Sequence, residues 1–255
     1  MLSYNSNKIS FDEIDKRLEL LDSNRPLEKS VLKNLKEHNT LDFIYNSNAI
    51  EGNTLTLRET KVVLEGLTIG GKTINEHLEV TNHKEAIDFL EELVNERCII
   101  TERIIKEIHA LILQTIDRKN AGKYRDANVI ITGASHIPPE HYLVKELMEK
   151  LLTDYYSWEN FHPIIRSAFL HGEFVKIHPF IDGNGRTARL LMNFELMKFG
   201  YPPITIKNAN KLKYYDALDK AHTTEDYTDF IKLIATEELE MLDFYLNIIG
   251  VHAKT

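Results

Sequence analysis

Apolar residues recur at intervals of three and four along most of the chain, which is the spacing of helices that bury one face. This pattern predicts ten helices joined by short polar segments, at about residues 11–21, 27–50, 56–66, 76–96, 101–116, 139–156, 162–176, 186–199, 210–221 and 227–248. Thr56 and Glu59 have the spacing of a capping box, and Gly66 and Gly200 lie where two helix C-termini are expected. The pattern therefore predicts an all-α protein.

One segment departs from the helical spacing. Val129–Thr132 are all β-branched, Gly133–Ser135 can form a turn, and His136 and Ile137 lead into two prolines. This order predicts a short β-hairpin. The hairpin could be a plain surface connection between helices, or a flap whose free edge pairs with another chain.

Composition and charge restrict the function only broadly. The formal net charge of −8 argues against a nucleic-acid partner, although a local pocket can still be positive. No apolar run is long enough to cross a bilayer, the N-terminus does not have the pattern of a signal peptide, and Cys98 is the single cysteine. We therefore expect a cytoplasmic protein without nucleic-acid or membrane partners.

The candidate chemistry lies between His178 and Arg189, in the segment HPFIDGNGRTAR. Apolar helical runs flank this segment, while Pro179 and two glycines interrupt the helical pattern, so it predicts a helix–loop–helix. Gly183–Gly185 leads directly into a helix N-terminus. Unpaired backbone N–H groups and the helix dipole favour an anion at such a position.

Four side chains beside this anion site suggest a reaction. Arg186 and Arg189 share one face of the expected first helical turn, and a polyphosphate would match both guanidinium groups. Asp182 could bind Mg²⁺ together with phosphate oxygens, and His178 could take a proton from a hydroxyl group. These are the parts that phosphoryl or nucleotidyl transfer requires. The alternative is a buried loop whose Asp and Arg pair and whose His fills the core.

The same segment resembles the Fic motif, H-P-F-x-[DN]-G-N-G-R-x-x-R, and matches it at every specified position. The similarity extends to Gly122–Arg125 and to the hairpin, over roughly residues 75–225. It implies a Fic-type helical bundle with one β-hairpin flap. We expect an N-terminal helical segment (1–70), a Fic core domain (71–225) and a C-terminal helix packed on the core (226–255).

The resemblance also implies a role for each residue of the motif. His178 would be the general base, Asp182 the Mg²⁺ ligand, and Asn184 and Arg186 would complete the catalytic group. The residues expected to bind ATP are Gly183, Asn184, Gly185, Arg186, Thr187, Arg189, Tyr214 and Tyr215. The two tyrosines would form a wall of the adenine pocket, although aromatic residues at helical positions also serve as core.

A second motif lies upstream, where Ser47-Asn48-Ala49-Ile50-Glu51-Gly52 ends a predicted helix. It resembles the inhibitory motif of many Fic proteins. There the glutamate, here Glu51, pairs with the second arginine, here Arg189, and obstructs the γ-phosphate. Taken without the resemblance, Ser47 and Glu51 are ordinary polar residues at a helix end.

The resulting prediction is a protein adenylyltransferase that moves AMP from Mg²⁺-ATP to a Ser, Thr or Tyr hydroxyl of a protein docked on Val129–His136. Gly185 favours AMP transfer, because Doc-type kinases of this family have a bulkier residue there. Two alternatives stay open: removal of AMP with Glu51 orienting a water molecule, and a non-catalytic ATP-sensing module. The sequence does not indicate an oligomeric state.

Overall fold

The computed structural model of the chain describes residues 2–251, and ten α-helices form most of this part. Their bounds are α1 (Asp12–Asp22), α2 (Lys29–Ile50), α3 (Leu57–Leu64), α4 (Ile74–Asn95), α5 (Glu102–Leu113), α6 (Val144–Ser157), α7 (Pro163–Ile177), α8 (Asn184–Lys198), α9 (Lys211–Thr224) and α10 (Thr228–Ile248). Each predicted helix is present. The largest departure is α6, which starts at Val144 because a single 3₁₀ turn (His141–Leu143) precedes it.

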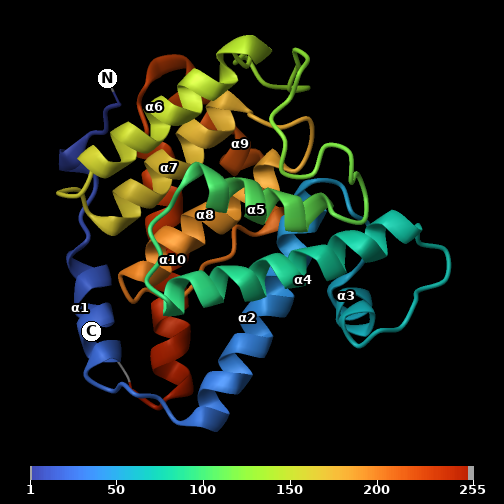
Figure 1. Cartoon of the computed structure of the whole chain (residues 1–255). Helices are drawn as coiled ribbons and strands as arrows, with labels where there is room; N and C mark the ends of the chain where they lie inside the picture. The colour runs from blue at the N-terminus through green and yellow to red at the C-terminus, as the bar shows by residue number, and fades with distance from the viewer. Residues whose placement is uncertain (1, 252–255) are drawn as a thin grey trace.

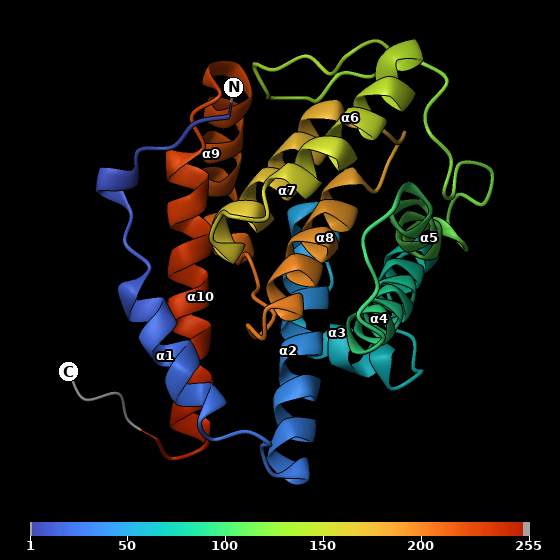
Figure 2. The same ribbon diagram turned by 60° about the vertical axis from the view of Figure 1, so that its left-hand side comes forward.

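The centre of the bundle is the pair α7 and α8, which the short candidate loop connects (Figure 1). Helices α4 and α5 pack together and against α8, α6 covers α7, and α9 and α10 lie on another side of the pair. The turned view shows α1 lying along α10 (Figure 2). No helix within residues 2–251 is both long and apolar enough to cross a bilayer.

Helix α8 is surrounded by other elements over most of its length. Within Asn184–Leu196, every residue except Gly185 is buried. Phe180, in the loop before α8, is also completely buried. Because core packing holds both α8 and Phe180, the loop between them is fixed at both ends.

The N-terminal segment is attached to the connection between α9 and α10. The N–H of Ser3 donates to the carbonyl of Glu225 at 3.0 Å, and the N–H of Tyr227 donates to the carbonyl of Ser3 at 2.9 Å. Further along, the Arg17 guanidinium pairs with Asp243 at 2.6 Å. These contacts connect the first and last parts of the described chain.

The predicted β-hairpin at Val129–Pro139 is wrong. This segment is an irregular loop with turns, and the residues that the structure describes contain no β-strand. The N–H groups of Ser135 and His136 donate to Asp219 of α9, at 2.7 and 3.1 Å. An isolated hairpin is marginally stable, so bonds to a helix replace bonds across the turn. The all-α fold class is otherwise confirmed.

Candidate active site

His178 lies where the chain leaves α7. Its backbone is in the left-handed region, with φ 50° and ψ 60°, and its N–H still donates to the carbonyl of Phe174 at 3.1 Å. This conformation is uncommon for residues other than glycine and requires support from the surrounding structure. It turns the chain sharply out of the helix, and the imidazole follows directly after the last helical residue.

The support comes from Arg125, whose guanidinium is buried. Its Nε donates to the carbonyl of His178 at 2.8 Å, Nη1 donates to Ala127 at 3.0 Å, and Nη2 donates to Pro139. The N–H of Arg125 also donates to the carbonyl of Pro179 at 2.9 Å. One side chain therefore fixes both the backbone of His178 and the base of the irregular loop.

The imidazole of His178 is neutral at physiological pH. Burial lowers its pKa to about 4, and the positive charge of Arg125 acts in the same direction. Its Nδ1 is buried and has no hydrogen-bond partner within residues 2–251. A neutral imidazole can accept a proton.

Asn184 shapes the loop from inside. Its side-chain oxygen accepts from the N–H of Phe180 at 3.0 Å, and its side-chain nitrogen donates to the carbonyl of Phe180 at 2.8 Å. Both polar atoms of the carboxamide are therefore used within the protein. In this arrangement Asn184 closes the loop into a narrow turn, and the backbone amides remain for a ligand.

His109 of α5 packs against the same loop and bonds to its backbone. No sequence motif marked this residue. Its Nδ1 accepts from the N–H of Gly122 at 2.9 Å, so its Nε2 carries the hydrogen and donates to the carbonyl of Asp182 at 2.8 Å. The ring stacks on Phe180 with centroids 3.6 Å apart. In the sequence, a histidine on the apolar face of a helix cannot be distinguished from an ordinary core residue, because its contacts with the loop form only in the folded protein.

The glycines predicted an anion site at the first turn of α8. Gly183 has φ 76°, and its N–H donates to the Asp182 carboxylate at 2.6 Å. The N–H groups of Asn184, Gly185 and Arg186 lie at the helix start, where no carbonyl of the preceding turn is available. A phosphate fits this geometry and the positive end of the helix dipole.

The Asp182 carboxylate lies at the entrance to this anion site and is 63% exposed. A Mg²⁺ ion fits here, because Mg²⁺ in nucleotide sites takes one or two carboxylates and obtains its other ligands from phosphate and water. No cluster of three or more acidic, histidine or cysteine side chains suited to a metal occurs in the described part of the chain. A metal ion at Asp182 therefore depends on a bound phosphate.

Arg186 is buried and lies between two carboxylates. Its Nη1 is 3.3 Å from Glu79 of α4, and its Nη2 is 3.3 Å from Asp182. Glu79 also accepts from the side chain of Asn53 at 2.7 Å, and no sequence motif marked this residue. The Nε of Arg186 is buried and has no hydrogen-bond partner among residues 2–251.

Arg189 is 1% exposed and is bound from the side of α2. Its Nε donates to the hydroxyl of Ser47 and its Nη2 to the carbonyl of Ser47, both at 2.8 Å. The same Nη2 donates to Glu51 at 2.7 Å. Burial alone disfavours the charge, but the Glu51 carboxylate and Tyr214 raise the pKa of Arg189 above its ordinary value.

Glu51 reaches this position because α2 ends at Ile50. Glu51 is the C-cap residue, and Gly52 follows with φ +103°. A side chain at Gly185 would collide with the Glu51 carboxylate and would lie 3.1 Å from Nη1 of Arg189. Gly185 therefore leaves the space that Glu51 and Arg189 occupy together.

Helix α9 holds the same end of α2. The carbonyl of Ile50 accepts from Nζ of Lys211 and, at 3.3 Å, from the hydroxyl of Tyr215. An unpaired carbonyl at a helix C-terminus is satisfied here by two side chains of another helix. The end of α2 is consequently attached to both α8 and α9.

The remaining residues expected to bind ATP divide into two groups. Tyr215 is 39% exposed beside the end of α2. Tyr214 is fully buried, and its hydroxyl lies 3.0 Å from Nε2 of His171 and 3.5 Å from Nη1 of Arg189. The hydroxyl of Thr187 is buried as well. Tyr214 thus contacts Arg189 inside the bundle, while Tyr215 lies partly exposed with Nζ of Lys211 5.5 Å from the centre of its ring.

Comparison with known proteins places this arrangement in a family. A model described as the Fic/DOC family matches residues 99–196. The protein adenylyltransferase Fic of Aedes aegypti is 38% identical over 245 residues, which are 91% of this chain and 48% of that protein. The protein of the same name from Drosophila melanogaster is 37% identical over 247 residues, or 93% and 49%. The chain spans about half the length of these curated relatives.

Two solved structures share the fold over most of the chain. A Fic domain containing signaling protein from Bacteroides thetaiotaomicron is 28% identical with a TM-score of 0.85, over 95% of this chain and 99% of that one. Part of Fic-1 from C. elegans is 30% identical with a TM-score of 0.80, over 94% of this chain and 72% of that one. The matched family range includes the whole of the loop that precedes α8. The chain belongs to the Fic/DOC family.

Proposed function

We propose that this protein is an adenylyltransferase that moves AMP from Mg²⁺-ATP to a Ser, Thr or Tyr hydroxyl of a target protein. The observation that carries the proposal is the neutral imidazole of His178 beside the start of α8, where free amides and Arg186 meet. The relatives named protein adenylyltransferase Fic support it. The single cysteine favours a reducing compartment, and we propose the cytoplasm.

In the proposed reaction His178 accepts the proton of the target hydroxyl. The hydroxyl oxygen then forms a bond to the α-phosphorus of ATP, and the bond to the β-phosphate oxygen breaks, so that AMP-protein and pyrophosphate leave. The amides of Asn184 and Gly185 and the Arg186 guanidinium stabilise the negative charge that develops on the phosphates. A Mg²⁺ ion held by Asp182 would neutralise further phosphate charge.

Gly185 favours this orientation of ATP over the reverse. A residue with a side chain at this position would fill the space beside Arg189. With glycine, the distal phosphates have room in the turn, and the α-phosphate is the group that faces His178. The product is then an AMP adduct rather than a phosphate adduct.

We also propose that Glu51 inhibits the enzyme. Its ion pair with Arg189 takes the guanidinium that would otherwise bind the γ-phosphate. ATP could still bind to the free amides, but its α-phosphate would be misplaced, and a displacement of about 1 Å can cost on the order of a hundredfold in rate. Ser47, which bonds twice to Arg189, holds α2 in this arrangement.

The proposed docking segment for the target is Val129–His136, now as an irregular loop. Ile130 is 87% exposed, and Arg125 connects the base of the loop to the backbone of His178. A target segment can pair with the backbone of Val129–Ile131, whose N–H groups are not used by the contacts to Asp219. Because such pairing uses backbone atoms, the enzyme would have low specificity for the target side chains near the acceptor hydroxyl.

The deciding experiment is intact mass spectrometry of proteins modified by the Glu51→Gly variant and Mg²⁺-ATP in a cell extract, combined with ATP labelled at the α- or the γ-phosphate. We expect an added mass of AMP and label only from the α-position. A phosphate adduct would indicate a Doc-type kinase. Release of AMP from a purified AMP-protein by the wild type, and not by Glu51→Gly, would favour removal of AMP. ATP binding without either product would indicate a sensing module.

A further inference from the structure

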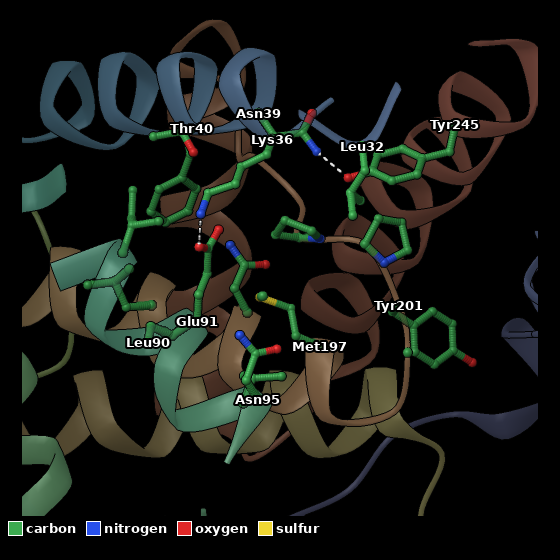
Figure 3. Close-up of a pocket in the computed structure, with 18 of the residues that line it drawn as sticks. Leu32, Lys36, Asn39, Thr40, Leu90, Glu91, Asn95, Met197, Tyr201 and Tyr245 are labelled. Carbon is green, nitrogen blue, oxygen red and sulfur yellow. Dashed lines mark hydrogen bonds and ion pairs between the residues drawn. The ribbon is translucent and has the colours of Figure 1, made fainter. Parts of the chain in front are cut away.

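Helix α2, which carries Glu51 at its end, is attached to α4 by polar contacts on either side of an open groove. The groove lies between α2, α4 and α8, and Lys36 pairs with Glu91 at one side of it (Figure 3). Past the end of α2, the side-chain nitrogen of Asn53 donates to Glu79 of α4 at 2.7 Å. Because the groove separates the two helices over part of α2, this second contact helps to fix where the C-terminal turn of α2 lies.

The carboxamide of Asn53 has one possible orientation. Its nitrogen donates to the carboxylate of Glu79 and, at 3.1 Å, to the carbonyl of Glu76. Its oxygen accepts from the N–H of Leu55 at 3.0 Å. Turning the group over would face oxygen to two acceptors and nitrogen to a donor. Asn53 therefore presents an N–H to Glu79.

Glu79 uses its two oxygens for two different partners. Oε2 accepts from Asn53, while Oε1 lies 3.3 Å from Nη1 of the buried Arg186. The carboxylate is itself only 22% exposed. One side chain of α4 thus connects an arginine beside the anion site to the segment that follows Glu51.

Glu51 and Asn53 belong to one closed backbone turn. The N–H groups of both residues donate to the carbonyl of Asn48, at 3.0 and 3.1 Å, and Gly52 is the single residue between them. Neither can move far without opening this turn. A contact that holds Asn53 on α4 therefore also holds the Glu51 carboxylate in its position against Arg189.

We propose that Asn53 and Glu79 are positioning residues for the inhibitory ion pair. Their contact keeps the last turn of α2 in the place where Glu51 reaches Arg189, and breaking it lets that turn move away and raises AMP transfer. Neither residue contacts His178, so the base is unaffected. This inference rests on the proposed inhibition by Glu51 and adds the device that maintains it.

The test exchanges donor and acceptor between the two residues. Asn53→Asp keeps an oxygen for Leu55 but sets a carboxylate against a carboxylate. In Glu79→Gln, the new amide keeps its oxygen on the charged Arg186, which is the stronger contact, so its nitrogen faces the nitrogen of Asn53. In the double variant the introduced amide donates to the introduced carboxylate, and the contact is restored in reverse. Only the weaker bond to the Glu76 carbonyl stays lost.

Hydrogen–deuterium exchange of the full chain, read by mass spectrometry over residues 47–55, follows the turn without any reaction. We expect faster exchange in each single variant and a return toward the wild-type rate in the double variant. The matched control is Asn120→Asp in the loop after α5, where Asn120 donates to Asp117 at 2.6 Å. It has the same chemistry away from α2, so exchange over 47–55 should be unchanged.

Label incorporation from α-labelled ATP then measures the effect on transfer. Each single variant should raise it about tenfold, the factor expected for one hydrogen bond to a charged group, and the double variant should lie within about threefold of the wild type. Asn53→Asp should add nothing in a Glu51→Gly protein, because the carboxylate that the contact positions is absent. Asn120→Asp should transfer AMP at the wild-type rate.

Two results would overturn the proposal: a double variant that exchanges or transfers at least as fast as the faster single variant, or an equal gain from Asn53→Asp with and without Glu51. Either result, with active Glu51→Gly protein, leaves the adenylyltransferase intact. Absence of label transfer even by Glu51→Gly would instead reject the proposed function. The reciprocal exchange pattern would still show that Asn53 and Glu79 hold the turn.

Discussion

Nη2 of Arg189 lies 2.7 Å from Oε1 of Glu51, although the two residues are 138 positions apart in the sequence. The dipole of α2 disfavours a carboxylate at its C-terminal end. Because α8 begins at Asn184, two residues before the predicted start, Arg189 lies in the second turn, where the dipole is weak. Burial, more than the dipole, makes Arg189 require an anion: either Glu51 or a phosphate.

Replacing Glu51 by glycine should activate the enzyme. With the carboxylate removed, Arg189 can bind the γ-phosphate, so we expect AMP transfer, including self-modification, to rise on the order of a hundredfold. The affinity for ATP should change less. Label incorporation from α-labelled ATP at saturating Mg²⁺ measures the first quantity, and calorimetric titration measures the second.

Two further variants make this comparison specific. Glu51→Gly combined with Arg189→Ala should lose the gain, because the released arginine is then absent. Glu65→Gly is the matched control: Glu65 is also a C-cap residue followed by a glycine with positive φ, at the end of α3. If Glu65→Gly activates as much as Glu51→Gly does, or if Glu51→Gly is no more active than the wild type, Glu51 is only a helix-end carboxylate.

His178→Asn should abolish transfer while the protein stays folded and binds ATP. Asparagine tolerates the left-handed conformation at this position better than alanine but cannot act as the base. We expect the transfer rate of a Glu51→Gly protein to fall by about 10²–10⁴-fold with little change in ATP affinity. Retained transfer by this variant contradicts the assignment of the base.

The pKa of His178 also predicts how far the pH can fall before the transfer rate decreases. A general base works in its neutral form, and the pKa of His178 is lowered to about 4. The rate should therefore hold as pH falls from 7 to about 5, whereas an ordinary histidine would lose most of its activity near pH 6. Label transfer by Glu51→Gly in buffers of constant ionic strength measures this. A midpoint near 6.5 would indicate that His178 is solvated in the working enzyme.

Asp182→Asn should weaken the dependence on Mg²⁺ selectively. The asparagine oxygen can still accept from the N–H of Gly183, so the turn before α8 is preserved. The metal ligand is then neutral, and we expect a higher Mg²⁺ concentration for half-maximal transfer and a lower maximal rate. Titration of transfer with Mg²⁺ at fixed ATP measures both. An unchanged Mg²⁺ titration argues against Asp182 as the ligand.

Ile131→Pro should impair modification of a protein target more than it impairs ATP binding. Proline removes one backbone N–H from the proposed docking segment, and loss of one hydrogen bond of about 1 kcal/mol corresponds to about fivefold in kcat/KM for the target. Ile130→Ser alters only an exposed side chain and should leave modification nearly unchanged. Equal rates for the proline variant and the wild type would remove this segment from the docking surface.

His222→Gln should make the protein less sensitive to acid. Burial lowers the pKa of His222 to about 4, from 6.5. The unfolded chain therefore binds more protons between these values, and stability is lost as pH falls through that window, by about 1.4 kcal/mol per pH unit. Glutamine can still donate to the carbonyl of Gly172, which His222 contacts at 2.9 Å.

Urea unfolding of both proteins at pH 7, 6 and 5 measures this difference. Buried carboxyl groups with a raised pKa, such as Glu238, change stability in the opposite direction, but they are common to both proteins and cancel. The difference in unfolding free energy should shift in favour of His222→Gln as pH falls. A constant difference would mean that His222 is accessible to protons in the folded state.

The helices could be predicted from the sequence because an amphipathic period is a local property repeated over many residues. The capping box of Thr56 and Glu59 is present for the same reason. The prediction of the hairpin was wrong because the backbone of this segment bonds to a distant residue. Asp219, more than 80 positions away, accepts hydrogen bonds from the N–H groups of Ser135 and His136. A β-branched run records a preference for extended backbone but not its hydrogen-bond partner.

Residues of the candidate site that are adjacent in sequence could be predicted from their spacing, and the pairing of Glu51 with Arg189 was predicted from the resemblance to the Fic motifs. The residues that support the loop from other helices could not be predicted. His178, Asp182 and the glycines share one loop, so their spacing carried the information. His109 and Glu79 support that loop from α5 and α4, and each looks ordinary within its own helix. Tyr214 was expected in a pocket wall, but it is fully buried and contacts Arg189. The helical spacing of an aromatic residue does not show whether it faces the core or a pocket, because this depends on how the other helices pack.

Arg125 bonds at once to the carbonyl of His178 and to both ends of the irregular loop. The separation between the imidazole and the loop backbone is thus set within this chain, before any acceptor arrives. In the proposed docking, a target segment that pairs with the loop would present its hydroxyl at a distance given by the length of its side chain. Serine and threonine are short and tyrosine is long, so one fixed separation would select between these two classes of acceptor.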